Sequence, residues 1–276
     1  MASVTQTSGS SPLKFFLLTY AVTWTFFIAA AALSGSAANS PLLAGVRGTF
    51  FLVGTFAPAI VALSLSIRDE GNASALLRRT VMWRVAARWY LFAVSYMAAI
   101  KLAVALVHRF ATEAWPRFGD ETWYIILVAI IVSTPIQAGE EIGWRGYALP
   151  RLASRFGFAR ASLLLGVIWA SWHLPLFFIP GIDKSGQSFP VYLLQVTALS
   201  VALAWLYAHT GGSLLLAMLM HSAVNETKDI VPSAVPAATE TWALSTSLVA
   251  WLTVALLWIG AGYFLVRMPK AKVEHR

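Results

Sequence analysis

The sequence predicts an all-α membrane protein, a polytopic bundle of about eight transmembrane helices. Of its 276 residues, 58% are hydrophobic and only 12% are charged, and the mean hydropathy is +0.70. This composition is far more apolar than that of a soluble domain. The apolar residues also form separate runs, most of which reach the roughly 20 residues that a helix needs to cross a bilayer.

Eight apolar runs follow one another along the chain. Small residues at 34–38, after the first run, are typical of a signal-peptide cleavage site, but the run exceeds the roughly 7–15 apolar residues of a signal peptide. We therefore predict that it is retained as a helix. The seventh run is short unless its helix continues through His221 and Asn225. The runs are 13–33, 49–67, 89–107, 123–143, 161–179, 190–208, 213–224 and 243–266.

We expect residues 13–268 to form a single membrane-embedded helical domain between two tails. Residues 1–12 are uncharged and rich in serine and threonine, which predicts a disordered tail, and residues 269–276 form a basic tail. Lysine and arginine concentrate in the inter-helix segments on one side of the predicted bundle. The positive-inside rule then places both termini in the cytoplasm.

Charge and cysteine content exclude several classes of function. The net charge of +8 comes from short inter-helix segments, so we predict a lipid bilayer and no nucleic acid as a partner. The chain contains no cysteine, so it has no disulfide, no thiolate nucleophile and no Cys-ligated metal. Lys101 lies in the outer half of its run, where we expect its long side chain to reach outward to the interface.

Two adjacent glutamates and an arginine close the fourth apolar run, within residues 139–146. A charge at membrane depth costs at least ~2.5–3.5 kcal/mol by insertion scales, so this cluster needs a reason. On a helix, Glu141 and Arg145 stand at i and i+4 with the acid first, the favourable order for an ion pair. Glu140 points about 100° away and has no local partner. We interpret Glu141 as the partner of Arg145, and Glu140 as the carboxylate available for chemistry.

Two further runs carry polar side chains at membrane depth. His173 lies one helical turn after Trp169, and Pro175 leaves a backbone carbonyl in that helix without its donor. His221 and Asn225 also lie one turn apart on one face. Polar clusters in a low-dielectric interior must find partners, so three of them together predict one functional site.

These residue types fit two kinds of hydrolytic site. Glu140 could take a proton from a water molecule, while His173, His221 and the Asn225 amide donate to the oxyanion formed at a peptide carbonyl. Alternatively, two neutral histidines and a carboxylate form a plausible catalytic zinc site with an open position for water. We favour hydrolysis of a peptide bond by an activated water and leave the metal open.

Other functions fit the sequence less well. It contains no Gly-x-Ser-x-Gly nucleophile turn and no His-Glu-x-x-His metal helix, and we expect every aspartate to lie outside the apolar runs. A non-catalytic membrane immunity or scaffold protein is one alternative. A proton-coupled carrier is another, although the chain shows no repeated half of the kind that transporters have.

Together the three clusters resemble the CAAX prenyl protease and bacteriocin-processing (CPBP) family, which includes the type II CAAX prenyl endopeptidases. The family pattern is Glu-Glu-x-x-x-Arg, then aromatic-x-x-x-His, then His-x-x-x-Asn, and the likeness covers roughly residues 45–226. Trp169 stands where many members have phenylalanine. The resemblance implies an eight-helix intramembrane endopeptidase in which Glu140 activates water and His173, His221 and Asn225 hold that water and the oxyanion. Members are commonly described as metalloproteases, although a glutamate mechanism without metal has also been argued.

The same resemblance limits the classes of substrate that we expect. Eukaryotic members trim the C-terminal tripeptide from prenylated cysteine proteins, and bacterial members have other roles, including peptide export and self-immunity. We therefore expect a membrane-associated peptide or protein substrate, with cleavage near the C-terminus of a membrane-associated or lipidated chain. The compact single domain favours a prokaryotic plasma membrane.

One geometric requirement follows from these assignments. By hydropathy the fourth helix ends near Gly143, which would leave Glu140 close to the cytoplasmic surface, at least ~10 Å from the histidines at 1.5 Å rise per residue. For the groups to meet, this helix must continue past Arg145, to about Leu152.

Overall fold

The computed structural model describes residues 3–5, 11–37, 40–179, 182, 184, 187–233, 241–244, 246–269 and 272–274. Its regular structure is almost entirely helical, which confirms the predicted fold class. The α-helices are α1 (Pro12–Ala32), α2 (Ser34–Ala37), α3 (Pro41–Glu70), α4 (Ser74–Arg78), α5 (Ala87–Thr112), α6 (Trp123–Ser133), α7 (Ala138–Glu141), α8 (Leu149–Trp172), α9 (Phe189–His209), α10 (Leu214–Thr227) and α11 (Leu248–Val266).

Shorter elements connect the long helices. Two three-residue strands, β1 (Ser3–Thr5) and β2 (Lys272–Glu274), pair in parallel. The 3₁₀ turns are η1 (Arg79–Val81), η2 (Thr134–Gln137), η4 (Leu174–Phe178) and η5 (Lys228–Ile230), and η3 (Ile142–Ala148) is a π-helix. Most of the two predicted tails lies outside the described residues, so the division into one domain and two tails stays a prediction.

Serine starts five of the long helices. In each case its side chain accepts a hydrogen bond from a backbone N–H of the first turn, which would otherwise lack a partner. In three of them proline occupies the first turn, where a missing N–H costs nothing. The capping residues are Ser11, Ser40, Ser188, Ser213 and Ser247.

Six helical segments of the described chain are long and apolar enough to cross a membrane. They comprise α1, α3, α5, α9, α11 and a 56-residue segment, Trp123–Phe178, which contains the fourth and fifth predicted spans. The seventh predicted span corresponds to α10, which continues through His221 and Asn225 but has only 14 residues. Large apolar side chains are exposed on these helices, among them Trp123 (72%) and Ile131 (70%), as expected of surfaces that face lipid. The chain is an integral membrane protein.

The required continuation of the fourth helix past Arg145 is confirmed. The elements α6, η2, α7, η3 and α8 follow one another without a loop from Trp123 to Trp172. The helix breaks only at Gly157, whose φ of 75° and ψ of 158° are not helical and are readily adopted by glycine. Glu140 therefore lies inside a helical segment and not at its end.

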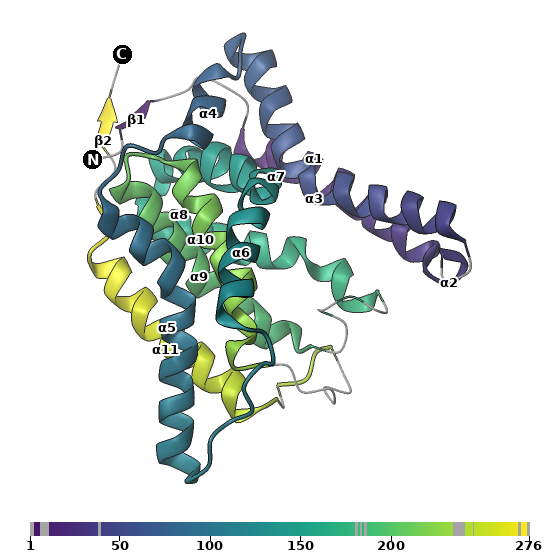
Figure 1. Ribbon diagram of the computed structural model, residues 1–276. Coiled ribbons are helices and arrows are strands. Elements are labelled where there is room, and N and C mark those ends of the chain that lie inside the picture. The colour runs from purple at the N-terminus through teal and green to yellow at the C-terminus, as the bar shows by residue number, and fades with distance from the viewer. Residues whose placement is uncertain are drawn as a thin grey trace.

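Figure 1 shows α1 and α3 projecting together from the bundle, with α2 at the tip of this hairpin. Elsewhere α8 packs on α9, α5 on α10, and α9 on α11. The hairpin is anchored next to the glutamates, because a Cβ added to Gly143 would lie 2.6–2.7 Å from atoms of Pro58 in α3. Only glycine at position 143 allows the two backbones to approach this closely.

Candidate active site

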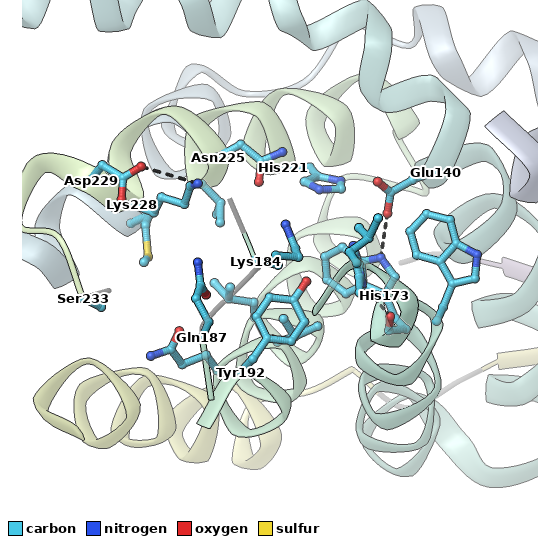
Figure 2. A pocket seen from close by; sticks show the side chains of 18 of the residues that line it. Glu140, His173, Lys184, Gln187, Tyr192, His221, Asn225, Lys228, Asp229 and Ser233 are labelled. Atoms are coloured by element: carbon cyan, nitrogen blue, oxygen red, sulfur yellow. Dashed lines mark hydrogen bonds and ion pairs between the residues drawn. The ribbon is translucent and has the colours of Figure 1, made fainter. Parts of the chain in front are cut away.

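Glu140, His173, His221 and Asn225 line one cavity of about 290 Å³. Glu140 is in α7, His173 directly follows α8, and His221 and Asn225 lie one turn apart in α10. Figure 2 shows Glu140 and His173 near one end of the cavity, with His221 and Asn225 along its wall. The helices thus bring together side chains from three predicted spans, and these side chains face a common space.

The indole of Trp169 is the hydrogen-bond partner of Glu140. Its Nε1–H donates to Glu140 Oε2 at 2.7 Å, and both residues are buried. A charge-assisted bond of this kind fixes the direction of a carboxylate. The sequence placed Trp169 on the face of His173 but gave no sign that it would reach Glu140, which lies 29 residues earlier.

Glu141 lies behind the cavity wall, where its Oε1 accepts two hydrogen bonds. One comes from Arg145 Nη1 at 2.7 Å, so the predicted ion pair is present, and both side chains are 0% exposed. The other comes from His221 Nδ1 at 2.8 Å, across 80 residues of sequence. The Arg145 guanidinium also lies over the Trp169 ring, with Cζ 4.1 Å from its centroid. Glu141 and Arg145 therefore hold His221 and Trp169 in place.

Hydrogen bonds define the tautomers of both histidines. The Nδ1 atom of His173 lies 2.8 Å from the backbone carbonyl oxygen of Trp169, and a carbonyl oxygen only accepts. The Nδ1 atom of His221 faces an ionised carboxylate, which likewise only accepts. Each Nδ1 therefore carries a proton, so a neutral ring accepts at Nε2, and a protonated ring can donate from Nε2.

The donor set does not fit a zinc ion. Within the described chain, no three histidine, aspartate or glutamate side chains lie close enough together to share one metal ion. Glu140, His173 and His221 line the same cavity without forming such a group. A catalytic zinc needs three protein ligands about 2.0–2.2 Å from one point, so we derive no reaction step through a metal.

The expectation for Lys101 was wrong. Its side chain does not reach outward to lipid or water but is 1% exposed and lines the same cavity. Its ammonium donates to Ser233 Oγ, and to Thr253 Oγ1 at 3.4 Å. Both acceptors lie more than 130 residues from Lys101 in the sequence, so no local pattern could have indicated this contact.

Comparison with known proteins agrees with the sequence motifs. Residues 119–227 match the family model of type II CAAX prenyl endopeptidase Rce1-like proteins. Over 238 residues the chain is 24% identical to CAAX prenyl protease 2 of Methanococcus maripaludis, covering 80% of this chain and 85% of that protein. The family match contains Glu140, His173, His221 and Asn225. Over residues 119–227 the chain is therefore similar to the type II CAAX prenyl endopeptidases, in agreement with the resemblance of its motifs to the CPBP family.

Proposed function

We propose that this protein is an intramembrane endopeptidase that hydrolyses a peptide bond with a water molecule activated by Glu140. The observation that supports this most is the convergence of a carboxylate, two imidazoles and an amide on one cavity in a membrane-spanning bundle. Glu140, His173 and His221 are buried, which is costly for such polar side chains. Together with the Asn225 amide they supply the base and the donors that peptide hydrolysis requires.

In the first step, Glu140 removes a proton from the water while the water oxygen attacks the peptide carbonyl carbon. The Trp169 indole holds Oε2 by its 2.7 Å hydrogen bond, which keeps the carboxylate directed towards the cavity. His173 in its neutral form accepts at Nε2 and can hold the second hydrogen of the water. The product of this step is a tetrahedral intermediate with negative charge on the former carbonyl oxygen.

The His221 ring and the Asn225 amide are the donors that stabilise this oxyanion. The Nδ1–H of His221 donates to Glu141 Oε1 at 2.8 Å, which directs Nε2 of the ring into the cavity. A protonated ring donates from Nε2. Asn225 lies one helical turn further along α10 and adds an N–H donor on the same face.

In the second step the intermediate collapses and the C–N bond breaks. Glu140, now protonated, returns its proton to the departing amine nitrogen, so the base of the first step is the acid of the second. The products are a new carboxyl terminus and a new amino terminus. The enzyme returns to its starting state.

The substrate in this proposal is a membrane-associated protein or peptide. The relative described above is named for prenylated CAAX sequences, in which a lipidated cysteine stands near the C-terminus. We extend this substrate class to the present chain. A lipid anchor would bring such a peptide to the bilayer surface, and the cavity volume of about 290 Å³ suits a short extended segment.

We also propose that the basic inter-helix segments and both termini face the cytoplasm of a prokaryotic cell. Arg151 Nη2 pairs with Glu70 Oε1 at 2.6 Å, so the end of α3 and the beginning of α8 lie on the same side of the bundle. These two regions carry many of the arginines, and the positive-inside rule assigns such a side to the cytoplasm.

The test is hydrolysis of a prenylated peptide by the purified protein in lipid nanodiscs. We expect Glu140→Gln to lower the rate by about 10²- to 10⁴-fold, since the amide cannot accept a proton, while thermal unfolding changes little. Glu121→Gln, the same change at an exposed loop position, is the matched control. Full activity of Glu140→Gln would refute the role of Glu140, whereas no hydrolysis by the parent protein would favour a scaffold or carrier.

A further inference from the structure

The cavity extends beyond the proposed catalytic groups to a second, lysine-lined end. Lys101, Lys184 and Lys228 line the cavity, and Asp229 is the only acidic side chain besides Glu140 among its described lining residues. Figure 2 shows Lys228 and Asp229 at the end of the cavity opposite Glu140. Lys101 lies at this end too, since it contacts Ser233 and is attracted by Asp229. We define the lysine-lined end by Lys101, Lys228 and Asp229, which together carry more positive than negative charge.

Lys101 is the most deeply buried of these cations. In the described part of the chain its Nζ donates hydrogen bonds to two neutral hydroxyls, those of Ser233 and Thr253. Hydroxyl dipoles hold the ammonium in place but bring no counter-charge. Asp229 attracts it but is exposed and forms an ion pair with Lys228 at 3.4 Å. A buried ammonium is costly in a membrane protein, and the mechanism proposed above makes no use of it.

The distance between the two ends matches a short peptide. Lys228 follows His221 by seven residues along α10 and η5, which corresponds to about 10 Å at 1.5 Å rise per residue. An extended chain covers about 3.3–3.6 Å per residue, so about three residues separate a peptide bond beside His221 from a group beside Lys228.

We propose that the lysine-lined end binds a carboxylate of the substrate, about three residues from the bond that is cleaved, with Lys101 as the residue that determines this specificity. The inference rests on the proposed function and concerns the same cavity. The carboxylate comes either from the chain terminus of the substrate or from an aspartate or glutamate side chain. Beside the buried ammonium of Lys101, a charge-assisted hydrogen bond selects a carboxylate over the neutral amide of the same shape.

The experiment measures binding to the full-length Glu140→Gln protein in nanodiscs, so that no turnover occurs. The probe is a fluorescent, farnesylated peptide whose last four residues are Cys-Val-Leu-Ser, prepared as the free acid and as the C-terminal amide. A second amidated pair carries Asp or Asn in place of the final serine. This pair separates a side-chain carboxylate from a terminal one.

We expect the free acid, the Asp peptide or both to bind about tenfold to a hundredfold more tightly than the matching neutral form. Adding Lys101→Met should abolish this preference, and Lys101→Arg should retain most of it. Lys14→Met removes a lysine that does not line the cavity and should leave the preference unchanged. A purely structural role of Lys101 would lower stability without changing the ratio between acid and neutral forms.

Equal affinity for the charged and neutral forms, or a preference that survives Lys101→Met, would overturn the inference. Hydrolysis by the parent protein separates this failure from failure of the proposed function. If both forms are cleaved equally and the cleavage depends on Glu140, only the carboxylate site is wrong. If the parent cleaves neither form but the Lys101-dependent preference remains, only the proposed hydrolysis is wrong.

Discussion

Glu141→Gln tests whether Glu141 is only the counter-ion of Arg145 or also orients His221. The substitution keeps the size and shape of the side chain but removes its charge. In the parent protein one oxygen, Oε1, accepts from both Arg145 Nη1 at 2.7 Å and His221 Nδ1 at 2.8 Å. A glutamine oxygen can still accept, but it can no longer neutralise the guanidinium or stabilise a protonated imidazole.

We expect Glu141→Gln to lower both the free energy of unfolding and kcat. Removing one partner of a buried ion pair costs about 3–5 kcal/mol because the other charge stays buried, and both partners here are 0% exposed. A loss of this size lowers the midpoint of thermal unfolding by about 6–20 °C. Loss of the orienting carboxylate of a catalytic histidine lowers kcat by about 10²- to 10⁴-fold.

A second substitution separates the two effects. The double variant Glu141→Gln, Arg145→Met removes both charges, and replacement of a whole buried pair by neutral groups is often close to neutral in stability. We expect thermal unfolding in nanodiscs to return towards the parent midpoint while hydrolysis of the prenylated peptide stays low. Recovery of activity together with stability would refute the reasoning and leave Glu141 as a counter-ion alone.

Two further predictions concern neighbouring positions. Asn225→Ala should lower kcat by about 10²- to 10³-fold, because it removes a proposed oxyanion donor. The unfolding midpoint should change little, since Asn225 is exposed at the cavity wall. An unchanged kcat would exclude Asn225 from the mechanism. Gly143→Ala should destabilise the protein by about 1–3 kcal/mol in thermal unfolding, because its Cβ would lie 2.6–2.7 Å from atoms of Pro58. Gly262→Ala, with nothing within 4 Å of the added Cβ, is the matched control, and equal midpoints for the two variants would contradict the packing argument.

The helical fold and the membrane spans could be predicted from the sequence because their causes are local. An apolar run of sufficient length satisfies its own backbone hydrogen bonds in lipid, whatever its neighbours do. The Glu141–Arg145 pair was also predictable, because helical periodicity alone puts positions i and i+4 on one face. The family motifs further indicated that side chains from three spans share a function.

The partners of the site residues could not be predicted, because they depend on how separate helices pack. Helical periodicity shows which face a side chain occupies, but not which helix lies opposite that face. The hydrogen bonds of Trp169 with Glu140 and of His221 with Glu141 span 29 and 80 residues, and each requires a particular rotation and depth of two helices.

The depth of the glutamates in the membrane and the direction of the Lys101 side chain also depend on tertiary packing and not on local sequence. Hydropathy ends the fourth span near Gly143 because arginines follow, although Arg145 pairs with Glu141 and the helix continues to Gly157. The position of Lys101 in its apolar run predicts a side chain at the membrane interface. Tertiary packing instead directs it towards Ser233 and Thr253. Sequence alone determined the helical membrane fold, the resemblance to the CPBP family and the residues capable of acid–base chemistry. Only the tertiary structure decided which of them meet, because a polar group in a low-dielectric interior takes its partner from whichever helix packs against it.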